Sequence, residues 1–158
     1  MGENDKAHDL CQLGTQRLMA GDVREAVKLF EQSIALKPTA EGYTYRGWAV
    51  SFLGRIDEAI EDCRKAIRLD PEFGNPYNDI GVYLMQKGRL NDAIPWLETA
   101  KQAKRYEPRH YPYLNLGRIY LAKGKPMQAL DEFVKALDYQ PNDSAVLAAI
   151  KKIKYSVN

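Results

Sequence analysis

Small and apolar residues recur along the chain in a pattern that repeats four times. Each copy contains a first glycine, and these first glycines are 33, 34 and 36 positions apart. A second glycine follows after 7 positions, an alanine after 12, a packing residue after 16, a small residue after 19 and then a closing proline. The columns are Gly14, Gly47, Gly81 and Gly117; Gly21, Gly54, Gly88 and Gly124; Ala26, Ala59, Ala93 and Ala129; Phe30, Cys63, Leu97 and Phe133; Ser33, Ala66, Ala100 and Ala136; Pro38, Pro71, Pro108 and Pro141. A period of this length indicates stacked units that bury one continuous core.

Each unit predicts two helices joined by a tight turn. The second glycine suits the left-handed backbone at the end of a first helix. Asp22, with Glu25 three positions later, is typical of a capping box at the start of a second helix, and Pro126 fits a first helical turn. The closing proline ends the second helix. We therefore expect an all-α chain.

The four units resemble the tetratricopeptide repeat. The fourth is the most similar, through Tyr113, Leu116, Gly117, Tyr120, Gly124, Ala129, Phe133, Ala136 and Pro141. The resemblance covers about residues 7–143 and implies a right-handed superhelical α-solenoid of antiparallel helix pairs, as a single domain over residues 1–158. The repeats are expected at about 7–39, 40–73, 74–109 and 110–143.

The third unit has a longer tail than the others. Pro108 lies eight positions after Ala100, whereas the corresponding interval in the other units is five. Three extra residues are nearly one helical turn, so the tail predicts an extended second helix. Pro95 lies inside that helix and is expected to kink it.

The residues after Pro141 predict a capping helix over about 144–155. Asp143 or Ser144 is a suitable N-cap, and Leu147, Ile150 and Ile153 are expected on one apolar face. Stacked repeats leave an open apolar end, which such a helix closes. The basic run 151–154 is interpreted as a solvated outer face.

Composition limits the class of protein. Of 158 residues, 45% are hydrophobic and 28% charged, which is typical of a globular chain, and no apolar run approaches a membrane span. The formal net charge of +2 gives no bulk electrostatic reason to expect nucleic acid as a partner. The polar N-terminus and the two cysteines, interpreted as reduced thiols, predict a cytoplasmic location.

Motifs for catalysis are missing from the sequence. His8 and His110 have no third histidine or suitably spaced carboxylate, so we expect neither a metal site nor a cofactor. The glycines fall once per helix and do not form a phosphate loop. The acid pairs at 57–58, 61–62 and 131–132 are expected on solvated second helices. The chain is therefore not expected to be an enzyme.

A concave groove lined by the first helices is the expected functional surface. Rotation of about 100° per residue places the positions six and three before the first glycine, and one and four after it, on this face. With their neighbours in the second to fourth units, these positions give the candidate groove: Thr44, Tyr45, Trp48, Phe52, Asn75, Asn78, Val82, Met85, Tyr111, Asn115 and Arg118. The first unit contributes His8, Cys11, Thr15 and Leu18. Exposed aromatic residues on such a face are typical of interaction sites. The alternative for Trp48 is that it packs against the neighbouring first helices and seals the groove.

Acidic C-terminal tails of heat-shock chaperones are not expected in this groove. Tetratricopeptide domains that bind them use two Lys, two Asn and one Arg. Those places fall here at Cys11, Thr15, Tyr45, Asn75 and Asp79, or one repeat later at Thr44, Trp48, Asp79, Tyr111 and Asn115. Neither set holds a Lys, and Asp79 stands where a cation is required.

The leading hypothesis is a non-catalytic module that binds a peptide segment of a partner protein. Two alternatives remain open: a subunit of a self-assembling scaffold, and a chaperone of secreted proteins. Self-association would separate the scaffold from a monomeric adaptor.

Overall fold

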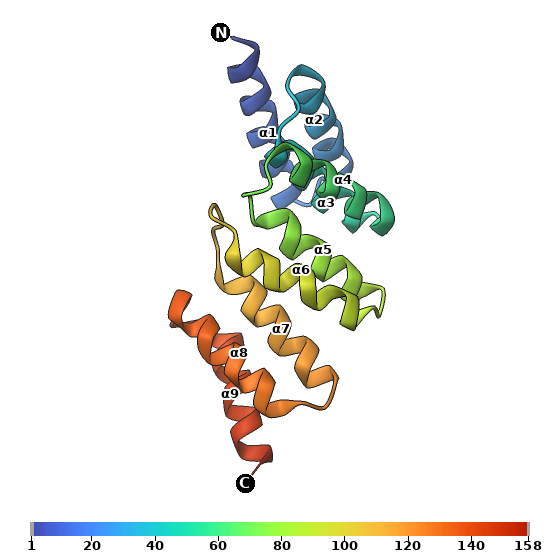
Figure 1. Ribbon diagram of the computed structural model, residues 1–158. Helices are drawn as coiled ribbons and strands as arrows, with labels where there is room; N and C mark the ends of the chain where they lie inside the picture. Colours follow the sequence, from blue (N-terminus) through green and yellow to red (C-terminus); the bar gives the residue numbers. More distant parts are fainter. Residues whose placement is uncertain (1, 158) are drawn as a thin grey trace.

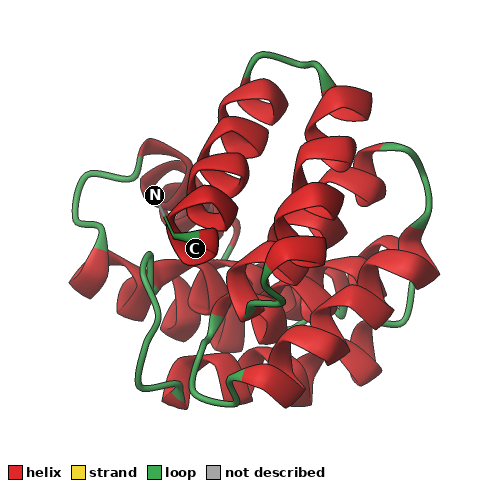
Figure 2. Ribbon diagram, turned by 90° about the horizontal axis from the view of Figure 1, so that it is seen from above, coloured by secondary structure: helices red, strands yellow, loops and turns green. Residues whose placement is uncertain are grey.

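Nine helices make up most of the computed structural model, which describes residues 2–157. They are α1 (Glu3–Met19), α2 (Val23–Leu36), α3 (Ala40–Phe52), α4 (Ile56–Leu69), α5 (Asn75–Gln86), α6 (Leu90–Gln102), α7 (His110–Ala122), α8 (Pro126–Tyr139) and α9 (Ser144–Ser156). Figure 1 shows them stacked in chain order, with the termini at opposite ends of the stack. Figure 2, viewed from above, shows helices joined by short loops, and no strand among the described residues. The all-α solenoid is confirmed.

Successive helices pair closely because the sequence places a glycine where a large side chain must fit. The contacts are densest within α1–α2, α3–α4, α5–α6 and α7–α8. A Cβ atom on Gly117 would lie 2.7 Å from Phe133 Cδ1, and one on Gly81 would lie 2.6 Å from Leu97 Cγ. In the first, third and fourth units the residue 16 positions after the first glycine therefore fills the space that the glycine leaves, whereas Gly47 in the second unit faces Ala59 and Asp62.

The predicted helix ends are largely confirmed. Gly21, Gly54, Gly88 and Gly124 have φ between +70° and +86°, the left-handed backbone that a tight helix–helix turn requires. The Asp22 carboxylate accepts a hydrogen bond from the Glu25 backbone N–H, at 3.4 Å. Asp143 caps α9 by accepting from the N–H groups of Ala145 and Val146, at 3.0 and 3.1 Å. Pro126 begins α8.

The prediction of an extended helix at the end of the third unit is wrong. α6 ends at Gln102, and residues 103–109 form a loop, called here the return loop. Arg105 pairs in parallel with Phe73: its N–H donates to Glu72 O at 3.0 Å, and its carbonyl accepts from Gly74 N–H at 2.9 Å. Tyr106 is buried against Gly74, whose missing side chain makes room for it. These contacts favour the loop over another helical turn. Pro95 lies inside α6, which is continuous around it; a kink there stays a prediction.

The buried face of the capping helix α9 differs by one residue from the prediction. Ile150 and Ile153 are buried as expected, but Leu147 is 45% exposed, and Val146 is fully buried in its place. Residues 146, 150 and 153 follow the 4-and-3 spacing of one helix face, and 147 lies about 100° around the helix from 146. α9 packs on α8 and closes the cluster around Phe133 and Ala136.

Candidate functional site

A groove of about 470 Å³ lies where α3, α5 and α7 come together with the return loop. Ten of the eleven candidate residues line it; Met85 does not, and packs instead against the main core. The lining residues are Thr44, Tyr45, Trp48, Ser51, Phe52, Asn75, Asn78, Asp79, Val82, Tyr83, Gln86, Tyr106, Pro108, Tyr111, Asn115 and Arg118. The rotation argument therefore brought together side chains from three helices in one hollow.

Trp48 and Phe52 form the apolar part of the groove. They stand one turn apart on α3, with their ring centroids 5.9 Å apart. Phe52 is 60% exposed, whereas Trp48 is half-buried and also packs against the core. Trp48 thus packs on the core and also lines the groove, and Phe52 is the more exposed of the two side chains.

Two of the three groove asparagines, Asn78 and Asn115, are bonded to each other. Asn115 Nδ2 donates to Asn78 Oδ1 at 3.0 Å, and Arg118 donates to Asn115 Oδ1 at 3.4 Å. Both asparagines are buried. These hydrogen bonds join α7 to α5. They also use some of the amide donors and acceptors that we expect, from the sequence, to bind a ligand.

Thr44 and Ser51 are also engaged within the protein. The buried Thr44 hydroxyl donates to the Ala40 carbonyl at 2.7 Å, and the Ser51 hydroxyl donates to the Trp48 carbonyl at 2.6 Å. Both bonds stay within α3, so these hydroxyls hold the helix rather than present a free donor.

The groove lining extends beyond the eleven candidates and includes Asp79, Tyr83, Tyr106 and Pro108. Tyr106 and Pro108 enter because the return loop folds back over the groove. In the sequence, the only signal for this loop is the three extra residues before Pro108, and their number predicts a helical turn as readily as a loop. Tyr83 is 3% exposed. Asp79 is half-buried, and burial raises its carboxyl pKa from 3.8 to about 7, against a smaller lowering by Asn78.

A second hollow, of about 500 Å³, continues the concave face toward the N-terminus. It is lined by His8, Cys11, Gln12, Thr15, Gln16, Glu41 and Tyr45. Tyr45 is shared with the groove, so the two hollows adjoin. Both cysteines are buried and free, and burial raises the Cys11 thiol pKa to about 11. A thiol with a raised pKa is a poor nucleophile at neutral pH.

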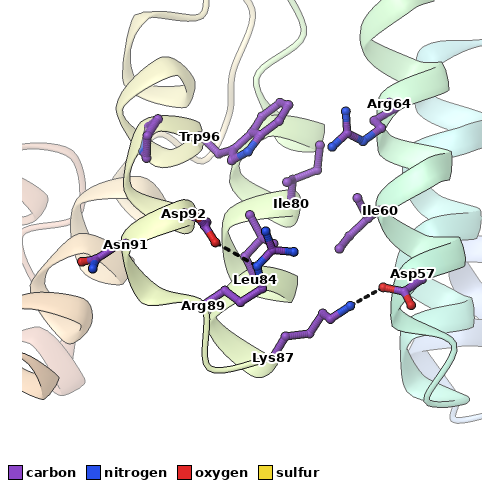
Figure 3. A pocket seen from close by; sticks show the side chains of 11 residues that line it. Asp57, Ile60, Arg64, Ile80, Leu84, Lys87, Arg89, Asn91, Asp92 and Trp96 are labelled. Atoms are coloured by element: carbon purple, nitrogen blue, oxygen red, sulfur yellow. Dashed lines mark hydrogen bonds and ion pairs between the residues drawn. The ribbon is translucent and has the colours of Figure 1, made fainter.

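A third hollow lies between α4, α5 and α6 (Figure 3), and the charged residues on its lining include two ion pairs. Lys87 bonds to Asp57, and Arg89 bonds to Asp92 at 2.8 Å. The Arg64 guanidinium lies 5.5 Å from the Trp96 ring. Because these charged groups already have partners within the protein, they are not available to pair with a charged ligand.

Two of the acidic residues expected in solvent are buried instead. Asp62 accepts two hydrogen bonds from Arg46, at 2.6 and 2.9 Å, and Glu132 lies 2.9 Å from Lys101. Both pairs join a second helix to another element, which is the reason for their burial. Asp57, Glu58, Glu61 and Asp131 are exposed as expected.

Residues 2–157 hold no cluster of three or more metal-ligating side chains. Within the same range, every helix is too short or too polar to cross a bilayer.

Family models for the tetratricopeptide repeat match residues 40–73 and 111–143. Among curated proteins, the type IV pilus assembly protein PilF of Pseudomonas aeruginosa is 27% identical over 154 residues, which cover 96% of this chain and 61% of PilF. The small glutamine-rich tetratricopeptide repeat-containing protein 2 of Mycosarcoma maydis is 33% identical over 90 residues, which cover 56% of this chain. The chain therefore spans less than two thirds of either relative, and only 26% of the second.

Solved structures share the arrangement of helices. The structure of Pseudomonas aeruginosa PilF has a TM-score of 0.89 at 26% identity, covering 98% of this chain and 71% of that one. A pilus biogenesis factor, PilW, has a TM-score of 0.84 at 20% identity, covering 94% of this chain and 69% of that one. A tetratricopeptide domain of Spaghetti, bound to an HSP90 peptide, has a TM-score of 0.60 at 24% identity, covering 64% and 94%.

Proposed function

Since the chain belongs to the tetratricopeptide repeat family, we propose that it is a non-catalytic interaction module, which binds a segment of a partner protein in the groove between α3, α5 and α7. The observation that carries the proposal is the Trp48–Phe52 pair. Trp48 is half-buried and holds its place by packing on the core, while the neighbouring Phe52 ring is exposed in a hollow lined by three helices. Aromatic side chains in such hollows are typical anchors of protein interfaces.

Two structural neighbours support this choice of ligand class. YrrB is a tetratricopeptide protein with an unusual peptide-binding site, and the Spaghetti domain holds an HSP90 peptide. Both proteins share the fold of this chain at only 20% and 24% sequence identity, so their particular ligands are not assigned to it. A cytoplasmic location belongs to the same proposal.

A displayed library of random 12-residue peptides, selected on the purified chain, tests the proposal. Selected peptides should bind the wild type and lose about thirtyfold in affinity on Phe52→Ala, since truncating an interface anchor commonly costs about 2 kcal/mol. Calorimetry on synthetic peptides measures the loss. Met127→Ala is the matched control, because Met127 is 57% exposed on α8, outside the groove.

The Trp48→Ala variant distinguishes a role of Trp48 in peptide binding from a role in core packing. We expect it to weaken peptide binding as strongly as Phe52→Ala does and also to lower Tm by several degrees, because Trp48 packs on the core. Helix content by circular dichroism should stay near wild type. Lower stability with unchanged affinity would remove Trp48 from the binding site, and peptides indifferent to both variants would refute the groove.

A second candidate, participation in type IV pilus assembly, is favoured by the match to PilF along nearly the whole chain. Expression in a Pseudomonas aeruginosa strain lacking PilF tests it. Restored surface pili would support this role, and their absence, with the chain stably expressed, would count against it.

A further inference from the structure

Asp79 stands in the groove without a counter-ion. Its carboxylate forms no ion pair within residues 2–157, although it is half-buried and shares the hollow with Trp48, Tyr83 and Tyr106. The buried acids elsewhere do have partners: Asp62 binds Arg46, and Glu132 binds Lys101. An unpaired carboxylate in a partly desolvated site destabilises the folded protein unless a cation pairs with it. Asp79 thus differs from the structural carboxylates of the same chain.

Two further polar atoms without partners flank Asp79 on α5. Asn75 Oδ1 and the Tyr83 hydroxyl are both buried and make no hydrogen bond of normal geometry among the described residues. Residues 75, 79 and 83 are four apart, so they form a row along one helix face. All three line the groove. The Asn75 amide oxygen and the ionised Asp79 carboxylate can only accept hydrogen bonds, and the Tyr83 hydroxyl can accept as well as donate, so a ligand group with several donors matches this row.

The charged and titratable groups around Asp79 leave its carboxylate uncompensated. Tyr45 and Glu41 come from α3, Cys63 from α4, Tyr83 from α5, Tyr106 from the return loop, and Tyr111 and Arg118 from α7. Glu41 is already bonded to Arg105, at 2.8 Å. Arg118, the only cation lining the groove among the described residues, is hydrogen-bonded to Asn115 rather than paired with Asp79.

We propose that the groove receives a Lys or Arg side chain of the bound segment on the Asp79 carboxylate, beside an apolar residue of the same segment on Trp48 and Phe52. Lys and Arg carry three and five donors and no acceptor, which matches the acceptor row on α5. The inference rests on the proposed function and specifies its ligand as a basic-and-apolar segment.

The peptides selected from the random library decide between the outcomes. We expect Lys or Arg to be enriched close to an aromatic or aliphatic residue, and this enrichment to vanish when the selection is repeated on Asp79→Asn. Apolar peptides without a basic residue, or with acidic ones, would overturn the cation site and leave the groove as the binding surface. Selected peptides that bind Phe52→Ala as well as wild type, or no selected peptides at all, would overturn both proposals.

Synthetic peptides with acetylated N-termini identify the side chain as the cation. Replacing the peptide Lys or Arg by Gln should weaken binding about tenfold at pH 8, a moderate loss for a charge pair that is only partly dry. The same replacement should have little effect on binding to Asp79→Asn. Asp57→Asn is the matched control: it removes the same charge from α4, where Asp57 bonds to Lys87 outside the groove, and should leave the loss intact.

The pH dependence of peptide affinity distinguishes a role of Asp79 in binding from a purely structural role. Because the Asp79 pKa is raised to about 7, its carboxyl is mostly neutral at pH 5.5 and ionised at pH 8. The pKa values of the neighbouring Tyr45, Tyr83, Tyr106 and Cys63 are all raised, so these groups stay neutral throughout. Affinity for the basic peptide should therefore rise about tenfold from pH 5.5 to pH 8 in the wild type and not in Asp79→Asn. An equal rise in both would overturn the assignment.

Discussion

At the scale of single residues, Asp79 shows a conflict between stability and binding. The groove surrounds its carboxyl with phenol and indole rings, which favour the neutral acid. The same carboxyl is the proposed partner of a ligand cation, for which it must be ionised. If Asp79 strengthens the complex at the expense of the free protein, then replacing its carboxylate should raise the stability of the free protein.

Asp79→Asn is expected to make the free protein more stable at neutral and alkaline pH. The folded-state pKa, about 7, lies above the ordinary 3.8, so the folded protein binds the proton more tightly than the unfolded chain does. Stability is therefore lost as pH rises from about 4 to about 7 and stays low above that range. Thermal melts of variant and wild type should coincide near pH 4 and diverge up to pH 7. A variant less stable than wild type at pH 8 would contradict the unpaired carboxylate.

Gly117 tests the close approach of α7 and α8. An alanine there would place its Cβ 2.7 Å from Phe133 Cδ1, and Phe133 is 1% exposed with little room to move. Gly117→Ala should destabilise by about 1–3 kcal/mol, as overpacked cores do. Urea unfolding measures this change. Gly2→Ala is the control, since its nearest neighbour would be Asp5 Oδ2 at 3.8 Å, and it should have almost no effect. Equal midpoints for the two variants would contradict this packing.

The sequence predicted single residues well where the repeat fixes them and poorly where side chains compete for partners. Ten of the eleven candidate groove residues share one hollow because helix rotation alone sets their direction. The pairing of Asn78 with Asn115 depends on the distance between two helices, which rotation does not give. The burial of Asp62 depends in the same way on Arg46 across the helix pair.

At the scale of elements, the return loop is the largest departure from the repeat. Arg105 binds Glu41 at 2.8 Å and Asp70 at 2.6 Å, and its guanidinium lies 4.3 Å from the Phe73 ring. The length of this insertion was readable from the repeat spacing but its path was not, because three residues fit a helical turn as well as a loop. The path follows from contacts distant in the chain: Arg105 is 64 residues from Glu41.

Arg105→Ala should lower stability by about 1 kcal/mol, because it removes two exposed ion pairs and a cation–π contact. The hydrogen bond from Arg105 lowers the Asp70 carboxyl pKa, so its stabilising effect is present above the ordinary pKa and is lost as pH falls through the lower folded value. Melting curves at pH 7 and pH 3 should therefore show a large and a small difference. Lys104→Ala is the control, since Lys104 makes a single exposed pair with Glu72. A difference that does not shrink in acid would contradict the role of Asp70.

At the scale of the whole molecule, α9 decides how the stack ends. Val146, Ile150 and Ile153 cover the cluster that contains Phe133, and Leu147 faces outward. The sequence predicted the helix, but the choice between Val146 and Leu147 is a rotation of about 100°, which the angle of α9 on α8 settles.

A variant that ends at residue 143 should expose that cluster and associate in solution. We expect a Tm lower by several degrees and a mass that rises with concentration in sedimentation velocity, because a stack without its cap presents apolar surface. Leu147→Ala, the control, should match the wild type in both measurements. A monomeric truncated chain with unchanged Tm would show that α9 is not a cap. Association of the intact chain would instead favour the self-assembling scaffold.

The return loop also bears on how the stack unfolds. Solenoids fray from their ends, because each unit is held only by its immediate neighbours. Here one segment binds α3 through Glu41, the α4–α5 connection through Asp70 and Phe73, and continues into α7. Opening the middle of the chain therefore requires several helices to separate together, whereas the ion pairs of Arg105 do not reach α1–α2 at one end or α9 at the other. The centre, which carries the groove, becomes one cooperative folding unit, and its amide hydrogens should be the last to exchange with solvent.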